Sequence, residues 1–454
     1  MSPILAIASI AIRSAIRSRV VLALFLLLLI IQLAFPSTLR GDGTWEGYLQ
    51  VLLHYTLGFS FWIIALAGMW AGCAAISHDI DAKTLQLVVV KPVNRLQIWL
   101  GKWIGLSLIS ATLMTLSMLL TVALLTLRPP PDLDPSHADL NLRDRLIARS
   151  VIEPPRPDVL AEARRILDTQ IQQGQIPPEV HPNDALRGII QNLQLQRLAV
   201  PPGQTLRWTL DLPAPHRPDL PLRLAYRFAL STIEPQPIPG RWLIRTPDGT
   251  PLLDLQTSAM PSVLNELQLD PRPLLGHPTL VIEYINLNQD GITVVFMPAD
   301  GFRLLVPAGT FTANALRALL ILLAQLLFLV AFGVTAGSLF SFPVAAFLSL
   351  YILLLIQSAG YIEAMAQTQL PLPFTGEAAP TLLHFLASLV YKIIHLTLHP
   401  LLMTSPLAPL ATGYLIPWTT TATTLLTKVL LYSGALALLS TAVLNRREIA
   451  LPST

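Results

Sequence analysis

The longest uncharged stretch of the chain, Ala318–Ile362, runs for 45 residues without a charged side chain. A helix needs about 20 apolar residues to cross the hydrocarbon core of a bilayer, so this stretch is too long for one crossing. The Gly337-Ser338 and Phe342-Pro343 steps within it indicate a tight turn. The stretch therefore predicts two membrane spans joined by that turn, which restricts the chain to the class of multi-pass helical membrane proteins.

Further apolar stretches of spanning length occur elsewhere. They are Val20–Leu39, Gly47–His78, Trp103–Leu127 and, near the end, Val429–Leu444. Charged residues make up 13% of the chain, roughly half of the 25% that is usual in soluble domains. We expect an α-helical membrane protein with six transmembrane helices: three in residues 20–127, two in 306–362 and one in 421–454.

A polar, proline-rich segment, Arg128–Leu305, interrupts this apolar chain. It holds 20 of the 27 acidic residues and 26 of the 39 prolines. Apolar and polar residues alternate in Thr205–Leu212 and again in Leu222–Leu230, which predicts half-buried strands. Asp158–Gln173 has the pattern of a helix. We expect residues 128–305 to form an inserted α+β domain, with its strands in a β-sandwich.

Two turn sequences in this segment predict β-hairpins. Pro247-Asp248-Gly249-Thr250 separates the strand-like segments Arg241–Thr246 and Leu252–Gln256. The turn Asn288–Gly291 separates Leu280–Asn286 from Ile292–Phe296 in the same way. No nucleophile elbow or pair of carboxylates stands out in the segment, so we expect a structural or partner-binding domain.

Basic residues of the short connecting segments set the orientation, because they collect on the cytosolic side. With both termini inside, the cytosolic segments hold nine of them: Arg13, Arg17, Arg19, Lys83, Lys91, Arg95, Lys102, Arg446 and Arg447. The opposite segments hold four: Arg40, Arg317, Lys392 and Lys428. We expect Arg317 and Lys428 to extend outward to the headgroups. This orientation places residues 128–305 outside the cytosol, and a bacterial inner membrane suits the usage of a single cysteine, Cys73.

Two segments are amphipathic without being long enough to span the bilayer. In residues 1–19 the apolar positions recur at helical spacing, and Arg13 and Arg17 lie on the other face, so we expect a helix in the membrane interface. Thr381–His399 is also amphipathic, and three prolines follow in Leu401–Trp418. We expect residues 363–420 to form an outer amphipathic or re-entrant cover.

The link between the second and third spans, Ser77–Arg95, carries the most information about function. It begins with the acidic residues Asp79 and Asp81, ends near Lys91, and stops at Pro92. That charge distribution predicts a short cytosolic helix over residues 77–95, because acidic residues stabilise the first turn of a helix and basic residues the last. A short helix held by two spans can transmit a push rigidly.

This link resembles the corresponding loop of the type-2 ABC exporter permeases. The matching order is an acidic residue, Thr84-Leu85, the aliphatic run Leu87–Val90, Pro92-Val93-Asn94-Arg95 and Gly101-Lys102. Lys83 departs from the pattern, since the family usually places glycine there. The basic ending Leu444–Ile449 is a second match, and within the family the six-span scaffold looks closest to the branch for copper-site maturation, the accessory proteins of nitrous oxide reductase. The resemblance does not cover Arg128–Leu305.

The resemblance implies a permease that forms a homodimer or pairs with a similar subunit, and that binds a cytosolic ABC ATPase. Its implied coupling residues are Asp79, Asp81, Lys83, Thr84, Leu85, Leu87, Lys91, Pro92 and Arg95. No Gly-x-x-x-x-Gly-Lys-Ser/Thr pattern occurs in the sequence, so we expect ATP to be bound by the partner subunit, with no cofactor in this chain and no enzymatic activity of its own. The net charge of +3 does not favour nucleic acid as a partner.

Three alternatives remain open. A mechanotransmission subunit would use ATP-driven motion to act through its external domain on a periplasmic partner, without transport. A membrane-anchored scaffold would need no ATPase. His78-Asp79-x-Asp81, or His384 together with His395 and His399, could ligate a metal, although a solvated loop and headgroup-level histidines explain them more simply.

Overall fold

The computed structural model describes residues 2–17, 19–38, 45–82, 93–127, 147–155, 158–176, 182–213, 219–232, 234–298, 301–368 and 405–446. The chain divides into two compact units. The helical unit comprises Met1–Asn141, Thr312–Leu372 and Pro380–Thr454. The β unit comprises Leu142–Phe311 and Pro373–Ala379.

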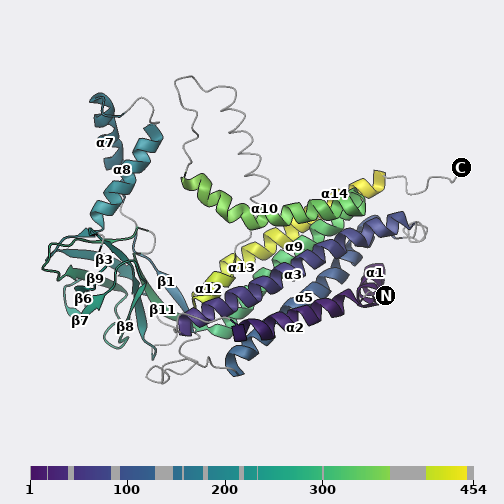
Figure 1. The fold of residues 1–454 in the computed structure, drawn as a ribbon, viewed down its shortest axis with the longest axis horizontal. Coiled ribbons are helices and arrows are strands. Elements are labelled where there is room, and N and C mark those ends of the chain that lie inside the picture. The colour runs from purple at the N-terminus through teal and green to yellow at the C-terminus, as the bar shows by residue number, and fades with distance from the viewer. Residues whose placement is uncertain are drawn as a thin grey trace. The chain divides into compact units, whose positions relative to one another are not determined.

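Long apolar helices run side by side in the helical unit (Figure 1). In chain order the helices of this unit are α1 (Pro3–Arg17), α2 (Val20–Thr38), α3 (Trp45–Asp81), α5 (Arg95–Leu127), α9 (Phe311–Leu339), α10 (Phe342–Thr368), α12 (Leu407–Ala411), α13 (Trp418–Thr424), the π-helix η2 (Leu425–Tyr432) and α14 (Ser433–Arg446). The turn expected near Phe342-Pro343 is present, because α9 ends at Leu339 and α10 begins at Phe342.

Among the described residues, four helices are long and apolar enough to cross a membrane: Val51–Asp81, Arg95–Leu125, Phe311–Leu339 and Trp418–Arg446. A fifth span results if α1 and the Val20–Ala34 part of α2, bent by 64°, count as one. At the bend, Arg19 takes a left-handed conformation with φ of 58°, which a helix does not continue through. The described apolar part of α10, Phe342–Ile356, is shorter than a full crossing. The helical unit is therefore a multi-pass membrane unit.

Glycines allow α3 and α9 to approach to backbone contact. A Cβ atom on Gly333 would lie 2.3 Å from the carbonyl oxygen of Met69, and one on Gly337 would lie 2.2 Å from that of Cys73. On the other helix, a Cβ on Gly72 would lie 2.8 Å from the backbone nitrogen of Val334. Gly68-x-x-x-Gly72 and Gly333-x-x-x-Gly337 thus form the small-x-x-x-small pattern of helix pairs in membranes.

The N-terminal helix α1 packs closely on α5 at two glycines of α5. A Cβ atom on Gly101 would lie 2.7 Å from Cβ of Ile7, and one on Gly105 would lie 2.8 Å from the carbonyl oxygen of Ala8. Ala8 is accordingly buried. Part of the apolar face that the sequence assigned to the membrane interface is therefore used in a helix–helix contact, while Arg13 and Arg17 stay exposed.

Lys428 does not extend outward as expected. Its side chain lies in η2 and the residue is 6% exposed, with the ammonium group 5.3 Å from the ring centre of Phe328 and 5.4 Å from that of Tyr432. The expectation failed because aromatic rings of α9 and of η2 itself lie around the ammonium group. Arg317 is half-buried, and it donates a hydrogen bond to the Ile416 carbonyl at 3.0 Å.

The described residues of the β unit form two helices and three antiparallel sheets. Its helices are α7 (Leu160–Gln172), where the sequence predicted one, and α8 (Pro182–Arg197). Its strands are β1 (Ile147–Ile152), β2 (Ala199–Val200), β3 (Thr205–Asp211), β4 (Leu222–Tyr226), β5 (Phe228–Leu230), β6 (Ile238–Arg245), β7 (Pro251–Ala259), β8 (Asn265–Leu269), β9 (Thr279–Asn286), β10 (Val294–Phe296) and β11 (Phe302–Thr310). The strand orders are β1-β11-β4-β8, β2-β10-β5 and β3-β9-β6-β7.

One hydrophobic core joins strands of all three sheets. Its large members are aromatic, and Trp208 stacks on Phe302 with ring centres 4.4 Å apart. Trp242, which is fully buried, lies 4.9 Å from the ring of Tyr284. The burial of Tyr284 raises the pKa of its hydroxyl group. Alternation in the sequence placed these side chains on the inner faces of the strands, as the burial pattern of β3 shows.

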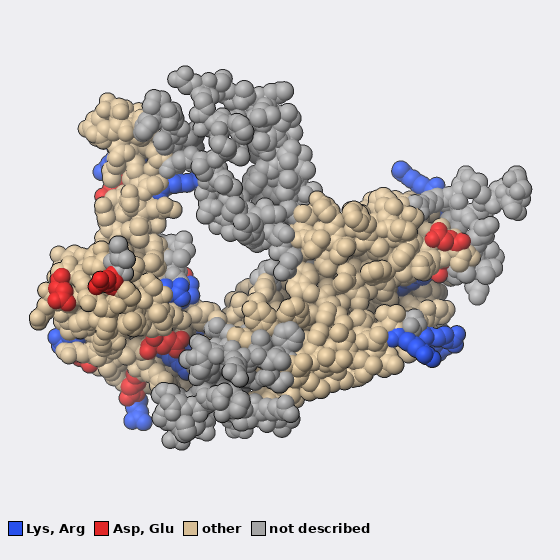
Figure 2. Space-filling model, viewed as in Figure 1, with Lys and Arg blue, Asp and Glu red and all other residues tan. Residues whose placement is uncertain are grey.

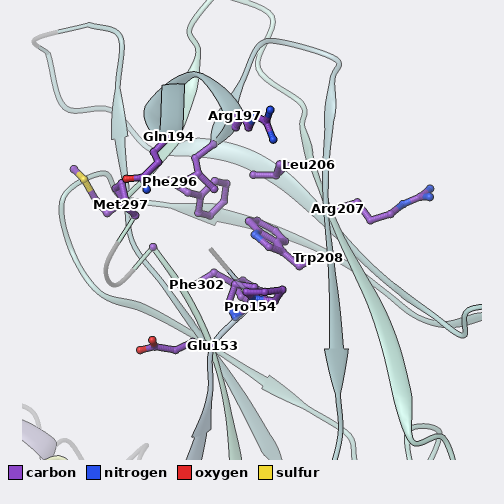
Figure 3. A pocket seen from close by; sticks show the side chains of 14 residues that line it. Glu153, Pro154, Gln194, Arg197, Leu206, Arg207, Trp208, Phe296, Met297 and Phe302 are labelled. Carbon is purple, nitrogen blue, oxygen red and sulfur yellow. The ribbon is translucent and has the colours of Figure 1, made fainter. Parts of the chain in front are cut away.

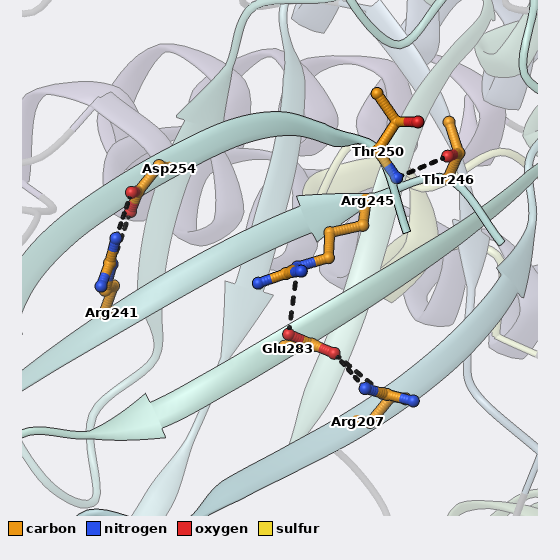
Figure 4. Close-up of polar contacts among 7 residues, drawn as sticks. All are labelled: Arg207, Arg241, Arg245, Thr246, Thr250, Asp254 and Glu283. Atoms are coloured by element: carbon orange, nitrogen blue, oxygen red, sulfur yellow. Dashed lines mark hydrogen bonds and ion pairs between the residues drawn. The ribbon is translucent and has the colours of Figure 1, made fainter. Parts of the chain in front are cut away.

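The first predicted hairpin is confirmed and the second is wrong. β6 and β7 pair directly, and Thr246 closes their turn by accepting a hydrogen bond from the backbone nitrogen of Thr250 at 3.2 Å (Figure 4). The segment after β9 does not fold back on it, since β3 and β6 occupy both edges of β9. The buried amide of Asn286 instead donates to the carbonyls of Val200 and Ile292, each at 2.9 Å, and β10 joins the sheet of β2 and β5.

The expected domain boundary at Leu305 falls inside a strand. β11 continues to Thr310, and residues 147–152 and 302–310 pair as neighbours in one sheet. The helix α9 begins only at Phe311. Residues 306–310 therefore belong to a strand and not to the fourth span, because they complete the pairing of β1.

Candidate coupling site

The acidic residues of the Ser77–Arg95 link lie in the last turns of α3. Ser77 donates its hydroxyl hydrogen to the Cys73 carbonyl at 2.6 Å, and the backbone nitrogen of Ala82 bonds the His78 carbonyl at 2.9 Å. Asp79 and Asp81 therefore do not open a separate short helix, as the sequence analysis expected. The apolar pattern of the second span simply continues through them, since Ile76 is fully buried and Ile80 packs on the same core cluster.

The far end of the link is the start of α5. The side chain of Asn94 accepts a hydrogen bond from the backbone nitrogen of Leu96 at 3.3 Å, and Gln97 accepts one from the backbone nitrogen of Asn94 at 3.1 Å. This reciprocal arrangement is a capping box, which satisfies free N–H groups at a helix start. Arg95 thus lies in the first turn of α5, and one of its terminal nitrogens is buried without a hydrogen bond among the described residues.

An ion pair joins the two ends. The ammonium group of Lys102 in α5 contacts the carboxylate of Asp79 and also donates a hydrogen bond to the carbonyl of Ala75. The Lys102 side chain is 12% exposed and that of Asp79 is 36% exposed. An acidic residue near a helix C-terminus is normally unfavourable, and Lys102 offsets this by supplying a positive charge there. Asp81, by contrast, is exposed.

The same region is connected to α9 and α14. Trp99 is almost fully buried, and its indole nitrogen donates to the hydroxyl of Thr335 in α9 at 3.2 Å. Further along, the hydroxyl groups of Ser440 in α14 and Ser338 in α9 lie 2.7 Å apart. These hydrogen bonds would therefore pass a displacement of the start of α5 to α9 and, through α9, to α14. Trp99 and Thr335 were not identified from the sequence, although the glycine spacing in α3 and α9 could have indicated that these two helices pack closely.

Charged side chains gather at this end of the helical unit. On the face drawn in Figure 2, the described charges of this unit lie over α1, the end of α3 and the end of α14, with uncharged surface between them and the other end. The basic residues of α1, of the bend after it and of the end of α14 are Arg13, Arg17, Arg19 and Arg446, which the positive-inside rule predicts to lie on one side of the membrane. This distribution is the one expected of a membrane unit with charges at an aqueous boundary.

The remaining predicted coupling residues lie outside the described residues: Lys83, Thr84, Leu85, Leu87, Lys91 and Pro92. So do His384, His395 and His399. Within the described ranges, no group of three or more His, Cys, Asp or Glu side chains is close enough to hold a metal ion. His78 instead lies beside the ring of Phe342, with ring centres 4.9 Å apart.

These features define a multi-pass membrane protein whose spans are linked at a charged end. Residues 5–132 match the family model described as ABC-2 family transporter protein, which supports an ABC-2 type permease. The match covers α1, α2, α3 and α5 with the link between them, and less than half of the 454-residue chain. Members of this family are membrane subunits of ABC transporters, so the match implies a membrane context and an ABC ATPase as partner. No curated protein matches the chain.

Proposed function

We propose that this chain is the permease subunit of an ABC export complex, driven by a separate cytosolic ATPase that binds the Ser77–Arg95 link. The observation that carries the proposal is the position of this link inside the segment that matches the family. There it joins α3 to α5, and the Asp79–Lys102 ion pair ties the two helix ends together.

The proposal includes an orientation and an assembly. Six spans cross a bacterial inner membrane, with both termini cytosolic and the β unit outside as a β-sandwich domain. ATP is bound by the partner ATPase, and the permease forms a homodimer or pairs with a similar subunit. The charged end formed by α1, α3 and α14 supports a single cytosolic face. The resemblance to the copper-site-maturation branch stays part of the proposal.

We propose two roles within the link. Because Asp79 is engaged by Lys102, we assign it to holding α3 against α5. Asp81 is exposed beside it and is better placed to contact an ATPase. ATP-driven closure would then tilt α3 and α5 together, and the Trp99–Thr335 hydrogen bond would pass the movement to α9.

The test is a charge reversal in the reconstituted permease–ATPase complex. Asp81→Lys should lower substrate-stimulated ATP hydrolysis at least fivefold while membrane insertion is unchanged, because the permease then no longer fits its ATPase. Glu234→Lys, an exposed charge reversal in the β unit, is the matched control and should leave hydrolysis within twofold. Unchanged coupling in Asp81→Lys would contradict the assignment of the link.

A second candidate function is mechanotransmission, in which the β unit acts on a periplasmic partner and nothing crosses the bilayer. It is favoured by the direct covalent continuity between β11, which ends at Thr310, and α9, which begins at Phe311. With no loop between them, movement of α9 would act directly on the sheet. Deleting residues 147–304 separates the two functions, since export that survives the deletion would exclude an obligatory mechanical role.

A further inference from the structure

The core of the β unit opens into a cavity of about 350 Å³ at one place. Three aromatic core residues converge on it, as Figure 3 shows: Trp208 of β3, Phe296 of β10 and Phe302 of β11. Leu198 and Leu206, which pack against the same core, also line it. The volume lies within the range of about 300–1,000 Å³ that is usual for ligand pockets. Apolar side chains of the core therefore line this cavity.

The charged residues at the rim are already paired. Arg197 contacts Glu162 at 2.7 Å, and Glu153 accepts a hydrogen bond from Arg303 at 2.9 Å. Arg207 points away from the cavity in Figure 3, and its guanidinium group contacts Glu283 at 2.6 Å (Figure 4). Because successive side chains of a strand point to opposite faces, this contact lies on the other face of β3 from Trp208. Because these charges have local partners, the cavity favours an uncharged, apolar group.

The strand beside the cavity is an edge strand. β3 pairs with β9 along its whole length, from Thr205 to Asp211, and among the described strands it has no neighbour on its other side. An open strand edge presents a row of backbone N–H and C=O groups that can pair with an added strand. The side chains of Leu206 and Trp208 in β3 line the cavity from the core side, so side chains of an added strand that point to the core side would enter it.

We propose that the β unit binds an extended peptide segment of a partner protein, which adds to the open edge of β3 and places a large apolar side chain in this cavity. The backbone of the peptide would supply affinity through strand pairing, and the cavity would select the side chain. The inference deepens the second candidate function, because it gives the β unit a partner site, and it does not depend on the ATPase link.

The experiment uses the full-length protein in lipid nanodiscs, without ATPase. The probe is a fluorescein-labelled peptide in which four Thr alternate with three Leu, flanked by lysines, and empty nanodiscs are the blank. Leu206→Trp fills the cavity and should raise the Kd at least tenfold. Leu253→Trp is the matched control, because Leu253 is also partly buried, on the other edge strand of the same sheet, β7, and it should leave the Kd within twofold. No binding to the wild type, or equal loss in both variants, would overturn the proposal.

Two backbone-methylated peptides test strand pairing on the wild-type protein, so the result does not depend on the folding of a variant. Each carries N-methyl groups on alternate residues, which removes the N–H donors from one edge of the strand. The peptide that is methylated on the edge facing β3 should bind at least tenfold more weakly than the parent peptide. The peptide that is methylated on its other edge should bind like the parent. Equal binding by both would show that a side chain or another apolar compound enters the cavity without strand addition, and would overturn the proposal. Failure here leaves the ATPase coupling untouched.

Discussion

The carboxylate of Asp79 at the end of α3 is paired with the ammonium group of Lys102 in α5, which also bonds the carbonyl of Ala75. The link between these helices therefore starts and ends at positions that are fixed to each other. Under the proposed function, a push on the link would move both helices, since neither helix can shift alone without breaking this contact.

Breaking this ion pair should destabilise the helical unit. Lys102→Met removes the ammonium group that pairs with Asp79, and removing one member of a buried pair costs about 3–5 kcal/mol, to be reduced here because Asp79 is 36% exposed. We expect a clear fall in the thermal unfolding midpoint in detergent. The charge swap Asp79→Lys with Lys102→Asp should recover part of the loss, and a swap no more stable than the single variants would contradict a direct pairing.

The contact between α3 and α9 should not tolerate a side chain. Gly337→Ala would place its Cβ atom 2.2 Å from the Cys73 carbonyl oxygen, so the helices must separate, and overpacking of this kind costs about 1–3 kcal/mol. The measurement is the unfolding midpoint and the yield of monodisperse protein. Gly434→Ala in α14 is the control, because nothing lies within 4 Å of its added Cβ. Equal behaviour of the two variants would show that the backbones do not touch.

Much of this architecture could be predicted from the sequence. Uncharged runs predicted the helices α2, α3, α5, α9 and α10, since no other structure satisfies their backbone in lipid. Alternation of apolar and polar residues predicted β3 and β4, because the apolar face of each strand must be buried. Local sequence patterns were sufficient wherever the buried face of a helix or strand follows from its own sequence.

Pairings between distant residues could not be predicted in this way. The Asp79–Lys102 contact and the burial of Lys428 depend on how separate helices are packed, and so does the hydrogen bond between Trp99 and Thr335. The wrong hairpin after β9 has the same origin. Its turn sequence is suitable, but β3 and β6 already occupy both edges of β9, a fact that no local pattern contains.

The β unit should depend on the buried amide of Asn286. Asn286→Leu removes three buried hydrogen bonds: the two that the side chain donates to the carbonyls of Val200 and Ile292 and the one that it accepts from the backbone nitrogen of Asn288, and each costs about 0.5–1.5 kcal/mol. We expect a lower unfolding midpoint for the β unit. The measurement is hydrogen exchange of the backbone amides of β9 and β10, which should be faster than in the wild type. Asn192→Leu, on the exposed surface of α8, should behave like the wild type. Wild-type exchange in Asn286→Leu would contradict the role of this residue.

Acid should weaken the pairing of β6 with β7. The hydrogen bond from Arg241 lowers the pKa of the Asp254 carboxyl group in the folded protein. A lowered folded pKa contributes stability above the unfolded value, about 3.9, and that contribution is lost as the pH falls through the folded pKa. In thermal unfolding between pH 7 and pH 2, Asp254→Asn should be the less stable protein at pH 7 and should match the wild type at the lowest pH. A difference that is constant over the range would exclude this linkage.

The central claim is that a separate ABC ATPase works through the Ser77–Arg95 link. It is tested most directly by affinity purification of the full-length protein from its native membranes, with the bound ATPase identified by mass spectrometry and measured by ATP hydrolysis. A stoichiometric ABC ATPase should co-purify with the wild type, and Asp81→Lys should reduce its amount at least fivefold while Glu234→Lys does not. A wild-type preparation without an ABC ATPase, or one retained equally by Asp81→Lys, would contradict it.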